Sequence, residues 1–223
     1  FEIKIGNSIE AVGELISQKI SDYENFQRSL PLDSSERALI LKTLGIDDST
    51  FKSNLLAINE SYKRALLLSG SQRAQELSII LNQLQGLEVP SGIVNSLTFS
   101  SEIVPDVNSV DPSYVNILTG EQEPSSEEAR NAIAFWQQSN VAISLNANVK
   151  SAAFAGNIRP LFSIVKLSLS SSVQDYYLVV SVPGTVLSSS HSGQELAPGV
   201  LGFKISGERE IVLAIDSGEV SKV

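Results

Sequence analysis

The spacing of apolar residues changes once along this 223-residue chain, at Pro90, and that change constrains the fold more than any other feature. Before Pro90 the apolar residues recur every three or four positions, which is the spacing of one face of an α-helix. After Pro90, short runs rich in Val, Ile, Leu and Ser lie between Gly, Pro and Asn, a pattern typical of strands and turns. We therefore expect an α+β protein with a helical region over residues 1–90 and a β-sandwich domain over residues 91–223.

Sequence signals for helix starts and stops divide the first ninety residues. Asp33 followed by Glu36 forms a capping-box arrangement, and Asp47 begins a second polar run that suits a helix start. Gly45 and Gly86 stand where helices are expected to end. The apolar stripes between these signals predict a small antiparallel helical bundle.

The second part has the pattern of an antiparallel sandwich with one inserted helix. The helix is predicted near 125–139, where Ser125 and Glu128 form a capping box. Its expected apolar side consists of Ala132, Ile133, Phe135 and Trp136. Short strand-like runs lie at 98–99, 103–104 and 114–118, and five longer strands are expected at 141–145, 161–169, 176–182, 200–205 and 211–215.

Charge and composition exclude several classes of function. With 16 Lys and Arg against 25 Asp and Glu, the net charge is −9 and there is no basic block, so nucleic acid is not an expected partner. The chain has no Cys and one His, which rules out disulfides and thiolate metal sites and leaves little for the usual zinc and haem sites. No apolar run approaches the roughly 20 residues of a membrane-spanning helix. We expect no cofactor, with calcium as the one candidate ion.

The absence of Met and Cys also bears on localisation. Because the sequence holds no initiator Met, we expect that it begins after a cleavage or a trimming step. A chain with neither thiol nor thioether is suited to an oxidising exterior. We therefore expect an extracellular or cell-surface protein, and an anchor outside the sequence stays open.

Candidate catalytic residues are weak. His191 lies in a Ser-rich, turn-like run, and the chain has no Gly-x-Ser-x-Gly elbow for a Ser-His-Asp triad. Acidic pairs occur at Glu121 with Glu123 and at Glu127 with Glu128, but the second pair suits the first turn of a helix, where it complements the exposed amide groups. We expect no enzymatic activity.

Asp106, Asn108 and Asp111 are the candidate metal ligands. They place three oxygen-bearing side chains within six residues, and hard cations such as calcium bind clusters of this kind. The run lacks the glycine and terminal glutamate of an EF-hand, so a solvated loop with local turns is the alternative interpretation.

The first five residues, FEIKI, alternate apolar and charged side chains as a strand does, although a helix follows them. Such a strand needs a partner elsewhere. It can join the C-terminal sheet of its own chain, which we expect first, or the sheet edge of a neighbouring subunit.

The strand–proline–strand pattern of residues 175–183, 198–205 and 210–215 resembles the immunoglobulin-like modules of archaeal cell-surface and secreted proteins. The resemblance leaves the helical region without a counterpart and carries over no catalytic residue. It implies an immunoglobulin-like sandwich that serves as a scaffold or an adhesive surface.

These observations predict a non-enzymatic extracytoplasmic structural protein. We expect a subunit of a cell-surface layer or filament that contacts copies of itself, or other surface proteins, through strand edges or the helical face. The alternative is a binding ectodomain, an adhesin or sensor, that recognises an extracellular ligand through the acidic segment 91–150 or the sandwich loops. A hydrolase with carboxylates that the sequence does not pair is a third hypothesis.

Overall fold

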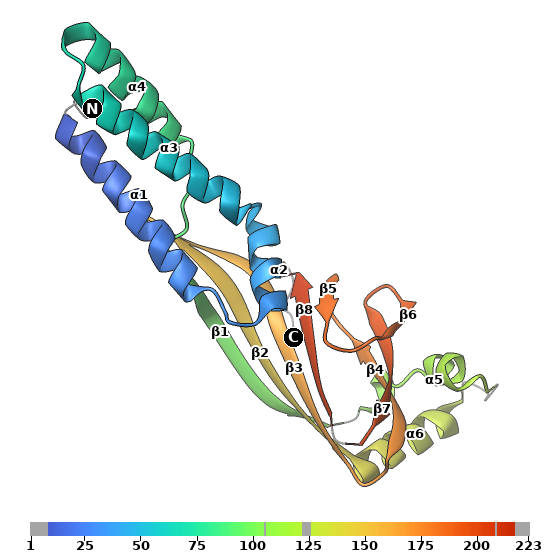
Figure 1. Cartoon of the computed structure of the whole chain (residues 1–223). Coiled ribbons are helices and arrows are strands. Elements are labelled where there is room, and N and C mark those ends of the chain that lie inside the picture. The colour runs from blue at the N-terminus through green and yellow to red at the C-terminus, as the bar shows by residue number, and fades with distance from the viewer. Residues whose placement is uncertain (1–8, 105, 122–125, 208, 217–223) are drawn as a thin grey trace. The chain divides into compact units, whose positions relative to one another are not determined.

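The computed structural model describes residues 9–104, 106–121, 126–207 and 209–216, and the chain divides into two compact units (Figure 1). The first unit contains the described residues up to Val94 together with the hairpin segment Ser151–Leu161. The second contains the described residues of Asn95–Lys150 and those from Phe162 to Asp216. Helices precede strands in the sequence, so the predicted α+β class and the helix-then-sheet order are confirmed.

The helices of the first unit begin and end where the sequence signals place them. Asp33 and Asp47 are N-caps whose carboxylates accept hydrogen bonds from the backbone N–H groups of Glu36 (2.8 Å) and Thr50 (3.0 Å). Gly45 ends its helix with a φ of 66°, a conformation that glycine adopts without steric cost. The helices are α1 (Ile9–Ser29), α2 (Ser34–Leu44), α3 (Asp48–Leu66) and α4 (Gly70–Gln85).

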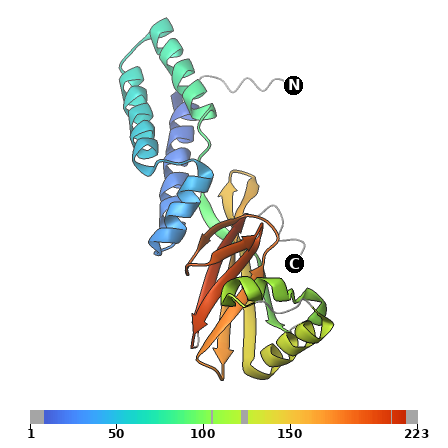
Figure 2. The same cartoon turned by 90° about the vertical axis from the view of Figure 1, so that its right-hand side faces the viewer.

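The core of the first unit lies between α1, α3 and α4 (Figure 2). Each helix turns one apolar stripe inward, as the three- and four-residue spacing predicts. The buried members are Val12, Ile16, Ile58, Ala65, Leu77, Ile80 and Leu84.

The described strands form two sheets. The larger has the order β1-β2-β3-β8-β5, and the smaller has the order β4-β7-β6. Strand β3 pairs antiparallel with β8, and β4 pairs antiparallel with β7. The strands are β1 (Gly92–Ile103), β2 (Val141–Phe154), β3 (Asn157–Ser171), β4 (Asp175–Ser181), β5 (Val186–Ser189), β6 (Gln194–Ala197), β7 (Val200–Ser206) and β8 (Arg209–Asp216).

Both sheets contribute to one hydrophobic core. Alternate residues of each strand point inward, because successive side chains leave a strand on opposite faces. The larger sheet supplies Ile143, Ala147, Val165, Leu167, Leu169, Ile211, Leu213 and Ile215, and the smaller sheet with its flanking turn supplies Tyr176, Leu178, Val182, Phe203 and Ile205. The five expected long strands are all present, but β2 continues to Phe154, well past the predicted end at residue 145, and β3 begins at Asn157, before the predicted start at residue 161.

Helices α5 (Pro112–Thr119) and α6 (Glu127–Asn140) lie between β1 and β2 in the sequence. The prediction of a strand over 114–118 is wrong, because Asp111 caps a helix there, Pro112 begins it and Gly120 ends it with a φ of 75°. A five-residue apolar run does not distinguish a strand from a short helix by spacing alone.

The helix predicted near 125–139 is confirmed as α6, with two differences in detail. Its N-cap is Ser126, whose hydroxyl accepts from the backbone N–H of Ala129, in place of Ser125, which lies outside the described residues. On the expected apolar side, Ile133 is half-buried but Ala132, Phe135 and Trp136 are exposed, whereas Ala134 is buried.

Helix α5 packs on the outer face of the smaller sheet. A Cβ atom placed on Gly202 would lie 2.7 Å from Leu118 of α5 and 3.0 Å from Leu196 of β6. Glycine at this position therefore allows α5 to approach the sheet closely.

Of the helices that the structure describes, none combines the length and the apolar character needed to cross a membrane.

The burial difference between Leu77 and Ile79 on α4 predicts different stability effects. Leu77 is 2% exposed and Ile79 is 45% exposed. Leu77→Ala should lower the free energy of unfolding of the helical unit by about 2–5 kcal/mol, because it leaves a cavity in a packed core. Urea unfolding followed by circular dichroism at 222 nm measures this, with Ile79→Ala as the matched control. Equal effects of the two substitutions would contradict the packing described above.

Candidate functional site

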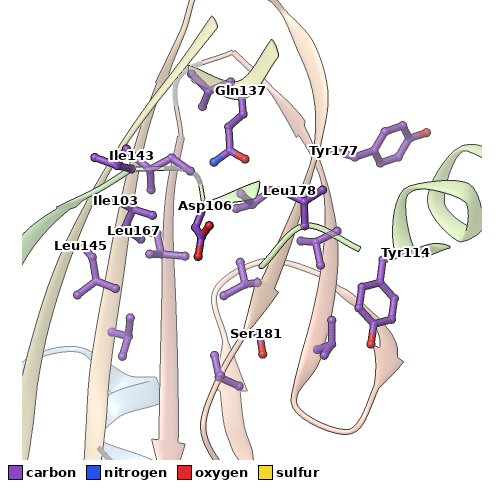
Figure 3. Close-up of a pocket in the computed structure, with 18 of the residues that line it drawn as sticks. Ile103, Asp106, Tyr114, Gln137, Ile143, Leu145, Leu167, Tyr177, Leu178 and Ser181 are labelled. Atoms are coloured by element: carbon purple, nitrogen blue, oxygen red, sulfur yellow. The ribbon is translucent and has the colours of Figure 1, made fainter. Parts of the chain in front are cut away.

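The second unit contains a cavity of about 730 Å³ between its two sheets, which we call the inter-sheet cavity. One wall is the inner face of β1, β2 and β3, and the opposite wall is β4 (Figure 3). Figure 3 shows Ile143, Leu145 and Leu167 facing Leu178 across the cavity, with Asp106 between them. Ile133, Trp136 and Gln137 of α6 and Tyr114 and Val115 of α5 also line it.

The cavity follows the edge of β4. Every residue from Tyr176 to Val182 lines it, although successive side chains of a strand point to opposite faces. The cavity therefore borders both faces of β4 around one edge of the strand, and Tyr114 and Val115 of α5 line it on the outer side. Strand β4 stands at the end of its sheet, with β7 as its one neighbour in the strand order. The edge of β4 that faces away from β7 therefore has no strand partner among the residues that the structure describes.

The number of strands in the two sheets explains why the cavity exists. The smaller sheet has three strands and the larger has five. On β2, Val141 and Leu145 pack against the core but are only partly buried, and both line the cavity. One further strand beside β4 would cover this face of β2.

The lining is mostly aliphatic and aromatic, and its charged members are acidic. Asp106 accepts a hydrogen bond from the backbone N–H of Asn108 (3.0 Å), and Asp111 accepts one from the backbone N–H of Ser113 (2.9 Å). Neither Lys nor Arg nor His is among the described residues that line the cavity. The cavity therefore suits an apolar occupant and repels an added carboxylate.

Two buried polar atoms of the lining have no hydrogen-bond partner in the described structure, the Tyr176 hydroxyl and Asn148 Oδ1. Tyr176 is 5% exposed, and its ring centroid lies 6.5 Å from that of Trp136. Burial raises the pKa of Tyr176 above its ordinary value of 10.0. A buried polar group without a hydrogen-bond partner lowers the stability of the folded chain.

The structure gives the three candidate calcium ligands local roles in turns. Asp106 caps the short 3₁₀ helix Val107–Ser109 and accepts from the Asn108 side-chain amide (3.1 Å), while Asp111 caps α5. In the described part of the chain, no three His, Cys, Asp or Glu side chains group closely enough to hold a metal ion. Calcium binding at Asp106, Asn108 and Asp111 stays a prediction.

The other candidate residues lie apart from the cavity lining. His191 hydrogen-bonds through its ring with the adjacent Ser190 (3.0 Å), and Ser190 lies beside β8, where its backbone N–H donates to Val212. Glu127 and Glu128 stand in the first turn of α6, and the backbone N–H of Glu128 and the Ser126 hydroxyl lower the pKa of the Glu128 carboxyl. Glu121 is exposed, and Glu123 falls outside the described residues.

Sequence reasoning missed the inter-sheet cavity. Its lining residues come from segments that lie more than a hundred residues apart, from Phe99 to Ile215, so no local motif marks it. The one relevant signal in the sequence is the predicted strand 176–182. Its place at the end of a sheet depends on strand order, which does not follow from the sequence.

No protein family, curated protein or solved structure matches the chain in the comparisons with known proteins.

The calcium prediction has a direct test. If Asp106, Asn108 and Asp111 hold calcium, millimolar CaCl₂ will raise the Tm of the chain, because an ion that binds the folded state stabilises it. Asp106→Asn should abolish the increase, and MgCl₂ serves as the ionic-strength control. An unchanged Tm would contradict the prediction.

The buried hydroxyl of Tyr176 predicts a pH-dependent difference. Because burial raises its pKa, the folded chain keeps the proton after the unfolded chain has lost it, so its contribution to stability is complete below pH 10.0 and is lost as the pH rises above that value. Tyr176→Phe should match or exceed the wild-type stability at pH 8, by up to about 2 kcal/mol, and should decline less above pH 10. Urea unfolding at several pH values measures this, with Tyr177→Phe as the control. A Tyr176→Phe chain less stable than wild type at pH 8 would show that the hydroxyl has a partner.

Proposed function

We propose that the chain is a non-enzymatic structural subunit of a cell-surface layer or filament, and that copies assemble by strand addition at the edge of β4. The observation that carries this proposal is the inter-sheet cavity, which is mostly apolar and runs along the whole of β4, at the edge where β4 has no strand partner in the described part of the chain. Adding a strand there would satisfy backbone groups of β4 and bury apolar side chains against β1 and β2. Extracytoplasmic localisation belongs to the same proposal and rests on the absence of Cys and Met.

The immunoglobulin-like character of the second unit is also a proposal. It is supported by two antiparallel sheets whose inner faces form one core, and by the strand–proline–strand pattern of the last third of the chain. A sandwich with a three-stranded sheet opposite a five-stranded one has room for one more strand beside β4.

A binding ectodomain is the second candidate function. It is favoured by the mostly aliphatic and aromatic lining of the inter-sheet cavity, which suits a small ligand with an apolar chain. Trp136 lines the cavity and is the single Trp of the chain, so its fluorescence reports on any occupant. Saturable quenching by a long-chain alcohol, in a chain that stays at 24.0 kDa at every concentration, would support this function over assembly.

A lysine introduced into the lining should prevent assembly. Ile103 lies in the cavity wall and is 38% exposed, so Ile103→Lys changes the lining with little effect on folding. We expect wild type to form species well above 24.0 kDa as concentration rises, and Ile103→Lys to shift assembly to at least about tenfold higher concentration, because a charge is costly in an apolar contact. Size-exclusion chromatography with light scattering and electron microscopy measure both.

Ile158→Lys is the matched control for this experiment. Ile158 is also on a strand and 57% exposed, but it is not part of the cavity lining. Equal assembly of wild type and both variants would exclude the inter-sheet cavity as the contact surface, and a wild type that stays monomeric at high concentration would contradict self-assembly.

A further inference from the structure

We infer that the occupant of the inter-sheet cavity is residues 1–5 of a second copy of the chain, added as a strand beside β4. This inference rests on the proposed function and names the partner segment that the assembly would use. Residues 1–5 lie outside the described residues, so the argument uses their sequence and the geometry of the cavity.

The sequence of residues 1–5 fits the chemistry of the cavity. In an extended segment Phe1, Ile3 and Ile5 fall on one face, and Glu2 and Lys4 fall on the other. The apolar face matches an inner wall formed by aliphatic side chains of β2 and β3. The two charges of the other face cancel, so the segment brings no net negative charge towards Asp106 and Asp111.

The length of the segment also fits. Five residues in a strand span about 17 Å, and β4, with its seven residues, spans about 23 Å. The backbone N–H groups of the added strand would pair with the free edge of β4, and its side chains would reach the level of Trp136 and Tyr176 on the inner side.

The other undescribed stretches do not have this pattern. Residues 217–223 place Val220 and Val223 three positions apart, and residues 122–125 contain Pro124 and no aliphatic residue. An alternating pattern of apolar residues is what a half-buried strand requires. Among the stretches that the structure leaves undescribed, residues 1–5 are therefore the ones suited to this edge.

A second copy is the source of the segment because the proposed assembly joins copies of the chain at this cavity.

The test places a carboxylate on the apolar face of the segment. Ile3→Asp should weaken assembly by about a hundredfold in concentration, because an aspartate would be buried among apolar groups close to Asp106. Glu2→Gln changes the opposite face and should assemble as wild type does. Light scattering over a range of concentrations measures the mass distribution of each full-length chain.

A peptide added to the Ile3→Asp chain then tests the cavity directly. A peptide of sequence FEIKIG should bind the vacant cavity and change Trp136 emission in a saturable way. A peptide of the same composition with its apolar residues adjacent should cause no change. Binding of the first peptide alone, together with loss of assembly in Ile3→Asp, supports the inference.

Three other outcomes would overturn it in distinguishable ways. Assembly of Ile3→Asp at wild-type concentrations would remove residues 1–5 as the partner but leave the proposed subunit function intact. A wild type that stays at 24.0 kDa while Ile3→Asp alters Trp136 emission would place the segment in its own chain. A monomeric wild type whose Trp136 responds to neither peptide nor substitution would overturn both the inference and the proposed function.

Discussion

Leu167 and Leu213 of the larger sheet pack with Phe203 of the smaller sheet at the centre of the second unit, where all three are at most 2% exposed. This contact fixes how the two sheets face each other. With the sheets held there, a three-stranded sheet is too narrow to cover a five-stranded one, and the uncovered area is the inter-sheet cavity. The candidate site is thus a direct result of how the sandwich is packed, and it does not depend on any reactive side chain.

The sequence predicted the elements better than it predicted the site. Helix boundaries at Asp33, Gly45 and Asp47 followed from local hydrogen-bonding rules, because a cap is decided within four residues. The strand prediction for 114–118 is wrong because it considers only the apolar residues of the run. The residues that define the helix are its caps, Asp111 and Gly120. Strand β5 pairs with the distant β8, and β6 forms a hairpin with the adjacent β7. Neither strand is expected from the composition of the segment after Val186.

Strand order is the property that the sequence could not provide. Residues 175–181 have the same alternating pattern whether they form a central strand or an end strand, and only in the second case does one edge stay open. The candidate ligands Asp106 and Asp111 were correctly placed in a loop, but their proximity to an apolar cavity depends on how α5, β1 and β4 come together. Sequence reasoning therefore identified Asp106 and Asp111 but did not predict the inter-sheet cavity that they line.

Gly202 has an effect that extends beyond its own position. It does not line the inter-sheet cavity, yet its missing side chain lets Leu118 settle on the sheet, and α5 carries Tyr114 and Val115 into the cavity lining. A methyl group at position 202 would lift the helix and change the width of the site from the opposite face of the sheet. The width of the inter-sheet cavity thus depends on Gly202, which does not line it. A residue that would not contact an occupant helps to set how large that occupant can be.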